Sequence, residues 1–443
     1  MHWKNDLKRS FTIAWPVIIG QLSYIALGVI DSMMVGRLGA TPLAAAALSN
    51  SYFALPLTFC FGLAAGIAPL AAKFYAQRDQ DQLSALHRNG LWATLGSSII
   101  AAILMYVFIF ILPYLGQPVD VVSTSEPYII LLAASLIPQT LFLSYKNFTE
   151  GLEWMKPALY VSVISVPINA ILNYLFIFGP WVFPEWGLTG AGIATLITRV
   201  FMLLAIHQLM SWSKLRSYID FRLKANIDTI KKILNIGVPA GIQYVFETGA
   251  FAIAALFMGM LGTIELAAHQ IAINLASIPF MVCIGLSAAG AIRMGNAYGN
   301  QNWPLIRQSG QNLLLITLLF MACSALVITL TKSFLPTLYI NDNQVINYAA
   351  QMLIIAALFQ LSDGIQAVCL GLLRGLEDVR IPTLFTLIAY WLIAIPLGYY
   401  LAFHGGMGYI GIWIGLLIGL SLSAVMLLAR FYALSRKMIK SDA

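Results

Sequence analysis

Long apolar stretches recur along the chain, and they give the first prediction about its fold. Twelve segments of about 20 residues or more are almost free of charge, and this length crosses the ~30 Å hydrocarbon layer of a bilayer. Backbone groups in lipid must be satisfied within the segment, and the strand-like alternation of a β-barrel is not the pattern here. The chain therefore predicts an all-α integral membrane protein with transmembrane helices near residues 11–35, 48–72, 90–115, 127–147, 158–180, 187–212, 233–259, 271–295, 311–332, 347–373, 381–403 and 409–434.

Composition and charge strengthen this prediction and add an orientation. Of 443 residues, 60% are hydrophobic and 10% are charged, against roughly 25% charged in an average soluble domain. The net charge of +7 does not indicate a nucleic-acid partner, because Lys and Arg gather before the first span, in alternate connections and at the C-terminus. The intervening loops hold only Arg37 and Lys332. By the positive-inside rule, this distribution places both termini in the cytoplasm.

The chain is internally duplicated. Shifting it by 223 residues aligns Pro16 with Pro239 without a gap as far as Tyr75 and Tyr298, and sixteen of these 60 positions are identical. A related match, Gly-Leu-Glu at 151–153 and 375–377, follows at an offset of 224. Six spans per repeat is an even number, so the repeats are parallel. We expect two pseudo-symmetric six-helix bundles, with lobes at 1–212 and 233–443 and a basic cytoplasmic linker at 213–232.

Three acidic residues fall inside predicted spans, where they need an explanation. Asp31 lies in the first span, Glu247 in the seventh and Asp363 in the tenth. An ionised carboxylate at mid-bilayer costs about 2.5–3.5 kcal/mol even on lenient scales, and such residues usually face the protein interior and mark ion pathways. Burial favours the neutral acid and a bound cation favours the carboxylate, so these acids suit exchange of a proton for Na⁺. The alternative is a hydrogen-bonded acid at a packed helix interface.

Asp31 has candidate partners in the first lobe. Asn169 and Asn173 are four residues apart and share one face of the fifth span, and Thr195 and Thr198 lie in the sixth. A carboxylate with two amide oxygens can hold Na⁺, or the amides can bond a protonated acid. The asparagine pair could equally hold helices together. The depths of Asp31 and Asn173 match only if a helix tilts or bends.

Glu247 and Asp363 are candidates for one shared site in the second lobe. Both lie roughly 15–21 Å from the inner face at a rise of ~1.5 Å per residue, whereas Asp31 lies further out. The duplication does not extend to these acids, since Asp31 aligns with Ala254 and Glu247 aligns with Tyr24. We infer that the acids serve chemistry more than architecture.

Other signals limit the function class. The sequence has no zinc-protease, hydrolase-elbow or phosphate-loop motif, so we expect neither an enzyme nor a bound cofactor. Without a nucleotide-binding domain, transport would depend on an ion gradient. Pro16 interrupts the span that carries Asp31; it is either a fixed kink or a point where bending couples to ion binding.

At these residues the sequence resembles the multidrug and toxic compound extrusion family, and most closely its NorM-type branch. The resemblance covers nearly the whole chain. It is carried by three groups of residues: Pro16, Asp31 and Val35–Gly39 in the first span; Val238–Pro239, Glu247, Leu261–Gly262 and Ala267–Asn274 around the seventh; and Asp363–Gln366 with Leu373–Gly375 in the tenth.

The resemblance implies antiport of cationic amphiphilic drugs against Na⁺, H⁺ or both by alternating access. It implies a role in antibiotic resistance, a location in the bacterial cytoplasmic (inner) membrane with lipid as the other partner, and a monomer. Asp31, Asn169 and Asn173 match the coupling site of the first lobe, and Glu247 and Asp363 match the cation site of the second. The branch often has a tyrosine one turn before the tenth-span acid, but this chain has Phe359, which puts a tyrosine ligand there in doubt.

Two questions stay open at this level. A flippase for lipid-linked glycans has a similar helical plan, although such proteins commonly have more spans and cationic cavities, whereas the charges within the spans here are acidic. Arg199 complicates this choice, because the sequence does not fix its depth in the sixth span. The same carboxylates can serve H⁺ or Na⁺, so the sequence does not decide between them.

Overall fold

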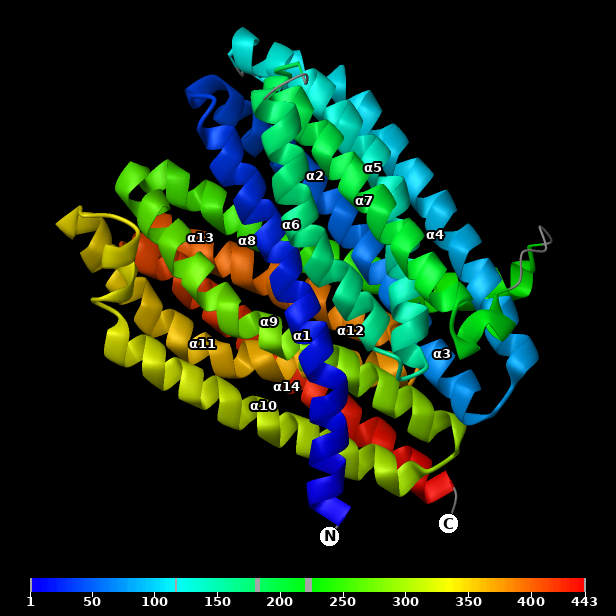
Figure 1. The fold of residues 1–443 in the computed structure, drawn as a ribbon. Coiled ribbons are helices and arrows are strands. Elements are labelled where there is room, and N and C mark those ends of the chain that lie inside the picture. Colours follow the sequence, from blue (N-terminus) through cyan, green and yellow to red (C-terminus); the bar gives the residue numbers. More distant parts are fainter. Residues whose placement is uncertain (1, 116–117, 180–183, 220–224, 442–443) are drawn as a thin grey trace. The chain divides into compact units, whose positions relative to one another are not determined.

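A computed structural model describes residues 2–115, 118–179, 184–219 and 225–441 (Figure 1). The described residues form helices joined by short connections, and they contain no strand. The elements are α1 (His2–Gly36), α2 (Ala40–Ala65), α3 (Ile67–Ala76), α4 (Gln80–Ile109), η1 (Leu112–Leu115), α5 (Val119–Gly151), α6 (Lys156–Phe178), α7 (Gly187–Ser211), η2 (Lys214–Tyr218), α8 (Ile227–Leu261), α9 (Thr263–Gly299), α10 (Trp303–Thr331), η3 (Leu335–Leu338), α11 (Asn343–Gly375), α12 (Arg380–Leu387), η4 (Ile388–Ala394), α13 (Ile395–Phe403) and α14 (Tyr409–Ser441).

The predicted all-α membrane architecture is confirmed. Within the described residues, twelve helical stretches are long and apolar enough to cross a membrane. Helices α2 and α3 together form one of them, and α12, η4 and α13 form another. The third span was predicted at 90–115, and both of its limits are wrong. It starts at Gln80, because the Asp79 side chain accepts a hydrogen bond from the Gln82 backbone N–H at 3.0 Å, and it ends at Ile109 before the separate turn η1.

The chain divides into two compact units, which are described separately here. The N-terminal unit is Ile19–Gly241, and the C-terminal unit is Met1–Ile18 together with Ile242–Ala443. Helices α1 and α8 therefore each contribute residues to both units. The predicted linker at 213–232 includes η2 and the start of α8. The predicted lobes at 1–212 and 233–443 divide the chain by its repeats, and they stay a prediction.

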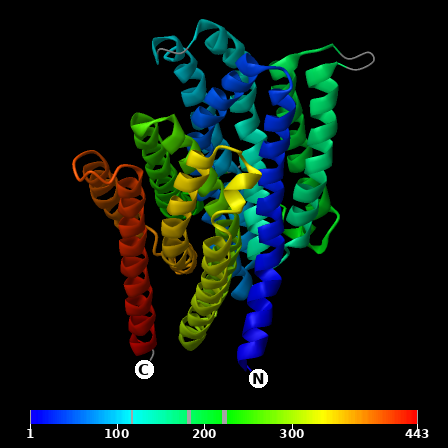
Figure 2. The same cartoon turned by 90° about the vertical axis from the view of Figure 1, so that its left-hand side faces the viewer.

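Each unit is organised around one long helix. In the N-terminal unit α5 packs against α2, α4 and α7, and α6 packs against α7; Figure 1 shows α4, α5 and α7 side by side. In the C-terminal unit α11 packs against α9, α10 and α14, and Figure 2 shows α14 in red, running to the C-terminus. Helices α5 and α11 carry the repeated Gly-Leu-Glu, so equivalent helices occupy the equivalent central position.

The duplication is visible in the backbone as well as in the sequence. Glu153 and Glu377 end these repeated segments with left-handed φ angles of 59° and 62°. Asp79 and Asn302, which are 223 positions apart, both cap a helix, and each side chain accepts a hydrogen bond from the backbone N–H three residues on. Left-handed residues other than glycine are uncommon. The agreement between Glu153 and Glu377, together with the matching helix caps, therefore indicates one inherited local geometry.

Glycines let the starts of α8 and α1 pack closely within these units. A Cβ at Gly62 of α2 would lie 2.5 Å from the Cα of Gly241 in α8. At the equivalent position of α9, a Cβ at Gly285 would meet Ile18 and the carbonyl of Ala14 in α1. Two helix crossings of the same kind, offset by 223 residues, thus hold the first part of α8 in the N-terminal unit and the first part of α1 in the C-terminal unit.

One glycine contact gives a stability prediction. A Cβ at Gly371 of α11 would collide with the backbone of Ser287 in α9, so Gly371→Ala should force these helices apart. Overpacking of this kind costs about 1–3 kcal/mol, and we expect a lower thermal unfolding midpoint for the purified protein. Gly96→Ala in α4 is the matched control, because nothing lies within 4 Å of its Cβ position. Equal midpoints for the two variants would contradict this packing.

Candidate functional sites in the two units

Asp31 lies in a polar cluster inside the N-terminal unit. The amide nitrogen of Asn173 donates a hydrogen bond to Asp31 Oδ1 at 2.5 Å and another to Asn169 Oδ1 at 3.1 Å. The Thr195 hydroxyl donates to Asp31 Oδ2 at 3.5 Å. Helices α1, α6 and α7 thus bring together the four residues predicted for the first lobe. The expected mismatch in depth between Asp31 and Asn173 does not prevent their contact.

Thr198 does not join this cluster. Its hydroxyl donates to the Ala194 carbonyl of its own helix at 2.7 Å. Thr195 also bonds its own helix, at the Ala191 carbonyl, but its oxygen remains near Asp31. Thr195 therefore faces the acid, and Thr198 bonds within α7.

The donor set at Asp31 can hold a proton or a small hard cation. The carbonyl oxygen of the Asn173 side chain is buried and has no hydrogen-bond partner in the described part of the chain, so it can accept a bond or bind a cation. Asn169 and Asn173 are 1% and 0% exposed. Within the described ranges, no three His, Cys, Asp or Glu side chains form a metal-binding group. A cation here would thus rely on one carboxylate with amide and hydroxyl oxygens.

Arg199 lies in the interior of the N-terminal unit. It is 9% exposed. Its Nη1 donates to the Ser135 hydroxyl at 2.6 Å, and its guanidinium carbon lies 4.7 Å from the centre of the Phe53 ring. The spans therefore contain a buried cation in addition to the acids. Sequence reasoning named Arg199, but it had no means of placing it beside the Asp31 cluster.

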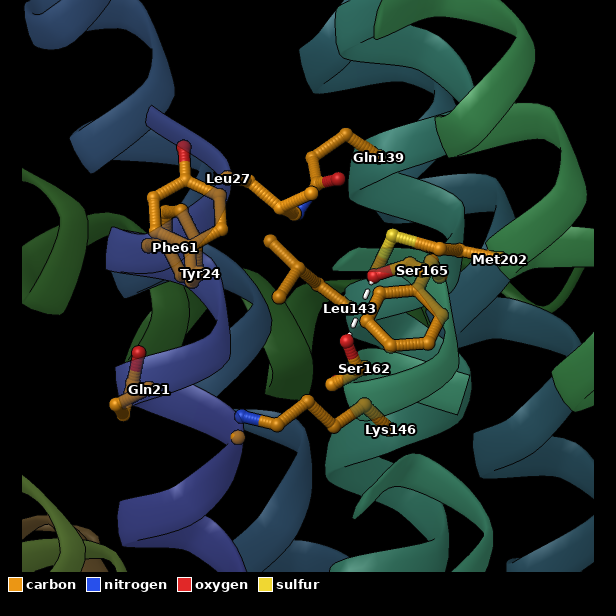
Figure 3. Close-up of a pocket in the computed structure, with 12 residues that line it drawn as sticks. Gln21, Tyr24, Leu27, Phe61, Gln139, Leu143, Lys146, Ser162, Ser165 and Met202 are labelled. Atoms are coloured by element: carbon orange, nitrogen blue, oxygen red, sulfur yellow. Dashed lines mark hydrogen bonds between the residues drawn. The ribbon is translucent and has the colours of Figure 1, made fainter. Parts of the chain in front are cut away.

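A pocket lies in the same unit, about one helical turn from Asp31 along α1. It lies between helices α1, α2, α5, α6 and α7, and its walls include Tyr24, Phe61, Gln139 and Met202. Figure 3 shows Lys146 reaching from α5 towards α1, on the side of the pocket where Gln21 lies. Lys146 is paired with Glu150 at 3.6 Å. The pocket thus combines aromatic walls with polar groups.

The second pair of acids lies in the C-terminal unit. Glu247 on α8 is half-buried, and Asp363 on α11 is 7% exposed. They interact electrostatically with each other, as expected for one shared site. Oδ1 of Asp363 is buried without a hydrogen-bond partner in the described residues. A buried carboxylate oxygen of this kind is suited to a proton or a cation.

Tyr390 also belongs to this site, and sequence reasoning missed it. It is fully buried and interacts electrostatically with both Glu247 and Asp363. Its hydroxyl accepts a hydrogen bond from the Gln366 amide at 2.8 Å. Tyr390 lies in η4, a π-helical segment inside an apolar span. Such segments often occur at functional sites, but a tyrosine among apolar residues gives no sign of one in the sequence.

Phe359, four residues before Asp363 on α11, packs against an aromatic side chain. Its ring stacks on Trp413, with centres 5.5 Å apart and an angle of 14° between the planes, and it is 2% exposed. The described residues therefore place one tyrosine hydroxyl, from η4, at the acid pair, and they place Phe359 in a stacked aromatic core.

The family model called MatE matches this chain over residues 16–175 and 239–400. The two matched ranges begin at Pro16 and Pro239, the first aligned pair of the duplication. The chain belongs to the MATE family. The family resemblance drawn from the sequence is thereby confirmed, and the protein is a multi-pass membrane transporter.

Relatives of this MATE transporter match over its full length. It is 32% identical to a probable multidrug resistance protein NorM of Rhizobium meliloti over 100% of this chain and 96% of that protein. It is 35% identical to one of Mesorhizobium japonicum over 97% and 94% of the two chains. The crystal structure of the eukaryotic MATE transporter AtDTX14 has the same fold, with a TM-score of 0.90 and 22% identity over 100% of both chains. That of the Vibrio cholerae MATE transporter VcmN in the bent form gives 0.87 at 19% identity, over 98% of both chains.

Proposed function

We propose that this MATE transporter exports cationic and amphiphilic drugs in exchange for Na⁺, H⁺ or both, by alternating access. The relatives described as probable multidrug resistance proteins support drug export. The proposal includes a bacterial inner membrane, cytoplasmic termini, a contribution to antibiotic resistance and a monomeric working state. The lipid-linked glycan flippase is the less favoured alternative, since the match is to drug-resistance proteins over the full length.

The Asp31 cluster is the observation that supports the proposed ion coupling. A carboxylate bonded at 2.5 Å by a buried amide, beside an unpartnered amide oxygen, can bind and release a small cation without rebuilding its surroundings. In the proposed cycle Asp31, Asn169, Asn173 and Thr195 hold the ion in the N-terminal unit. Glu247 and Asp363 hold it in the C-terminal unit, and Pro16 allows α1 to bend as the ion is exchanged.

Ion exchange can be tested in proteoliposomes with the purified full-length protein. We expect a fluorescent cationic dye to move against an imposed pH gradient, an imposed Na⁺ gradient or both, and to stop when an ionophore collapses the gradient that drives it. The two gradients applied separately decide between H⁺ and Na⁺. Dye movement that ignores both gradients would refute the proposed antiport.

Tyr390 should contribute to the second site through its hydroxyl. Tyr390→Phe removes only this oxygen from a buried position that faces Glu247 and Asp363. We expect Na⁺-driven dye efflux to need about tenfold more Na⁺, a change within the usual range of coupling energies. The control is Tyr409→Phe, whose hydroxyl bonds Gln351 at an exposed position. Equal Na⁺ dependence in the two variants would exclude Tyr390 from the site.

A further inference from the structure

The Asp31 cluster contains a fixed positive charge that the proposed ion exchange does not use. Arg199 is on α7, four residues after Thr195, which places it one helical turn, about 6 Å, along the axis. Its charge interacts electrostatically with Asp31. A guanidinium stays protonated at any physiological pH. In this structure Asp31 is therefore accompanied by a permanent cation.

Two neutral groups hold the Arg199 guanidinium in place. Ser135 on α5 accepts from Nη1 at 2.6 Å, and the Phe53 ring on α2 lies under the guanidinium at 4.7 Å. Neither group is an anion. In the described residues, Arg199 and Asp31 lie close enough to interact but form no ion pair within 4 Å. A cation held in this way can balance the carboxylate without occupying its oxygens.

Besides Arg199, the titratable groups that interact with Asp31 are Tyr24 on its own helix and Tyr128 on α5. Helix α6 presents Asn169 and Asn173, which are neutral. Asp31 is therefore the acid that balances the Arg199 charge.

The acid pair of the C-terminal unit has the opposite balance. Glu247 and Asp363 bring two acidic groups together, and Arg374 is the cation that interacts with Glu247. Arg374 lies eleven residues after Asp363 on the same helix, about 16 Å along it, and its guanidinium carbon lies 5.5 Å from the centre of the Tyr244 ring. Two acids with one cation leave an excess negative charge, whereas Asp31 with Arg199 leaves none.

We propose that Arg199 is a built-in counter-cation that excludes Na⁺ and other metal cations from the Asp31 site. The inference deepens the proposed ion-coupled export and rests on it, because it restricts which ion the Asp31 site takes. Arg199 acts as a specificity-determining residue through its charge, and it need not touch the transported ion.

Binding of ²²Na⁺ to the purified full-length protein tests this assignment. In the double variant Glu247→Gln, Asp363→Asn, we expect no saturable Na⁺ binding. Adding Arg199→Gln should create a Na⁺ site. Its apparent affinity for Na⁺ should be at least about tenfold higher than that of the double variant with Arg199 present, because a nearby fixed positive charge is removed from a medium of low dielectric constant. That site should disappear again with Asp31→Asn. Arg199→Lys is the matched control, since it keeps the charge and should create no site.

Two results would overturn the proposal. One is Na⁺ binding in the double variant that depends on Asp31 while Arg199 is present. The other is a folded Arg199→Gln variant that gains no binding. If that variant does not fold, Na⁺ stoichiometry decides the matter without it: Asp31→Asn should leave the stoichiometry of the otherwise unaltered protein unchanged, and a loss of one ion would refute the exclusion.

Dye efflux separates this inference from the proposed function. A protein that binds ²²Na⁺ as expected but moves no dye under any gradient would refute drug–ion antiport and leave the assignment of Na⁺ intact. A protein that exports dye but binds Na⁺ at Asp31 would refute the role of Arg199 alone.

Discussion

Asp31→Asn should reduce export of a cationic dye from energised membrane vesicles to the background level, a loss of at least about tenfold given usual coupling energies. The variant keeps the size of the side chain and removes the charge that receives the Asn173 amide at 2.5 Å. An amide in this position can be neither protonated nor ionised in the physiological range, so ion exchange at the first site stops. The measurement is dye efflux at matched amounts of protein in the membrane.

Asp79→Asn is the matched control for this experiment. It makes the same chemical change in the same unit, at the N-cap of α4, where asparagine caps a helix as well as aspartate does. We expect export by this variant to equal that of the unaltered protein. Undiminished export by Asp31→Asn would remove Asp31 from ion coupling.

Glu247→Gln and Asp363→Asn should share one phenotype. Both acids interact with each other and with Tyr390, so removing either one disrupts the same group of oxygens. We expect dye efflux driven by a Na⁺ gradient to fall at least about tenfold in each variant, and the double variant to lose little more, because residues of one site are not additive. Efflux driven by a pH gradient is the parallel measurement.

The control for the second site is Asp342→Asn, at the start of the helix that carries Asp363. Asp342 caps α11 by accepting from the Gln344 and Val345 backbone N–H groups, so the amide variant should behave as the unaltered protein. Different losses in Glu247→Gln and Asp363→Asn, or full additivity in the double variant, would show that the two acids belong to separate sites.

The sequence was sufficient for the membrane architecture, because length and apolar content decide whether a helix spans a bilayer. It also singled out the acids, since a carboxylate in lipid is costly wherever it lies. The Asn169–Asn173 spacing predicted a shared face of α6, and Asp31 does meet that face. These inferences depend on local periodicity and on desolvation, which can be evaluated without a fold.

The rest depended on contacts between distant segments. Tyr390 lies in the π-helical segment η4 and bonds Gln366, and hydropathy predicts neither the π-helical segment nor this contact. The Ser135 hydroxyl accepts a hydrogen bond from Arg199, which lies 64 positions later in the chain. No repeat or motif in the sequence predicts this pairing. The limits of α4 were misjudged because the Asp79 cap lies outside the apolar run on which the prediction relied.

The way α1 and α8 are shared has a consequence for the origin of this chain. Each unit is completed by a helix start that belongs to the opposite half of the sequence, through Gly62 with Gly241 and Gly285 with Ile18. A half-length ancestor with this packing could not have closed its own core; two copies would have exchanged these segments, as in a domain-swapped dimer. A fusion of two such copies would make the exchange intramolecular. The same reasoning applies to dissection: fragments separated between α7 and α8 should fold only when they are expressed together.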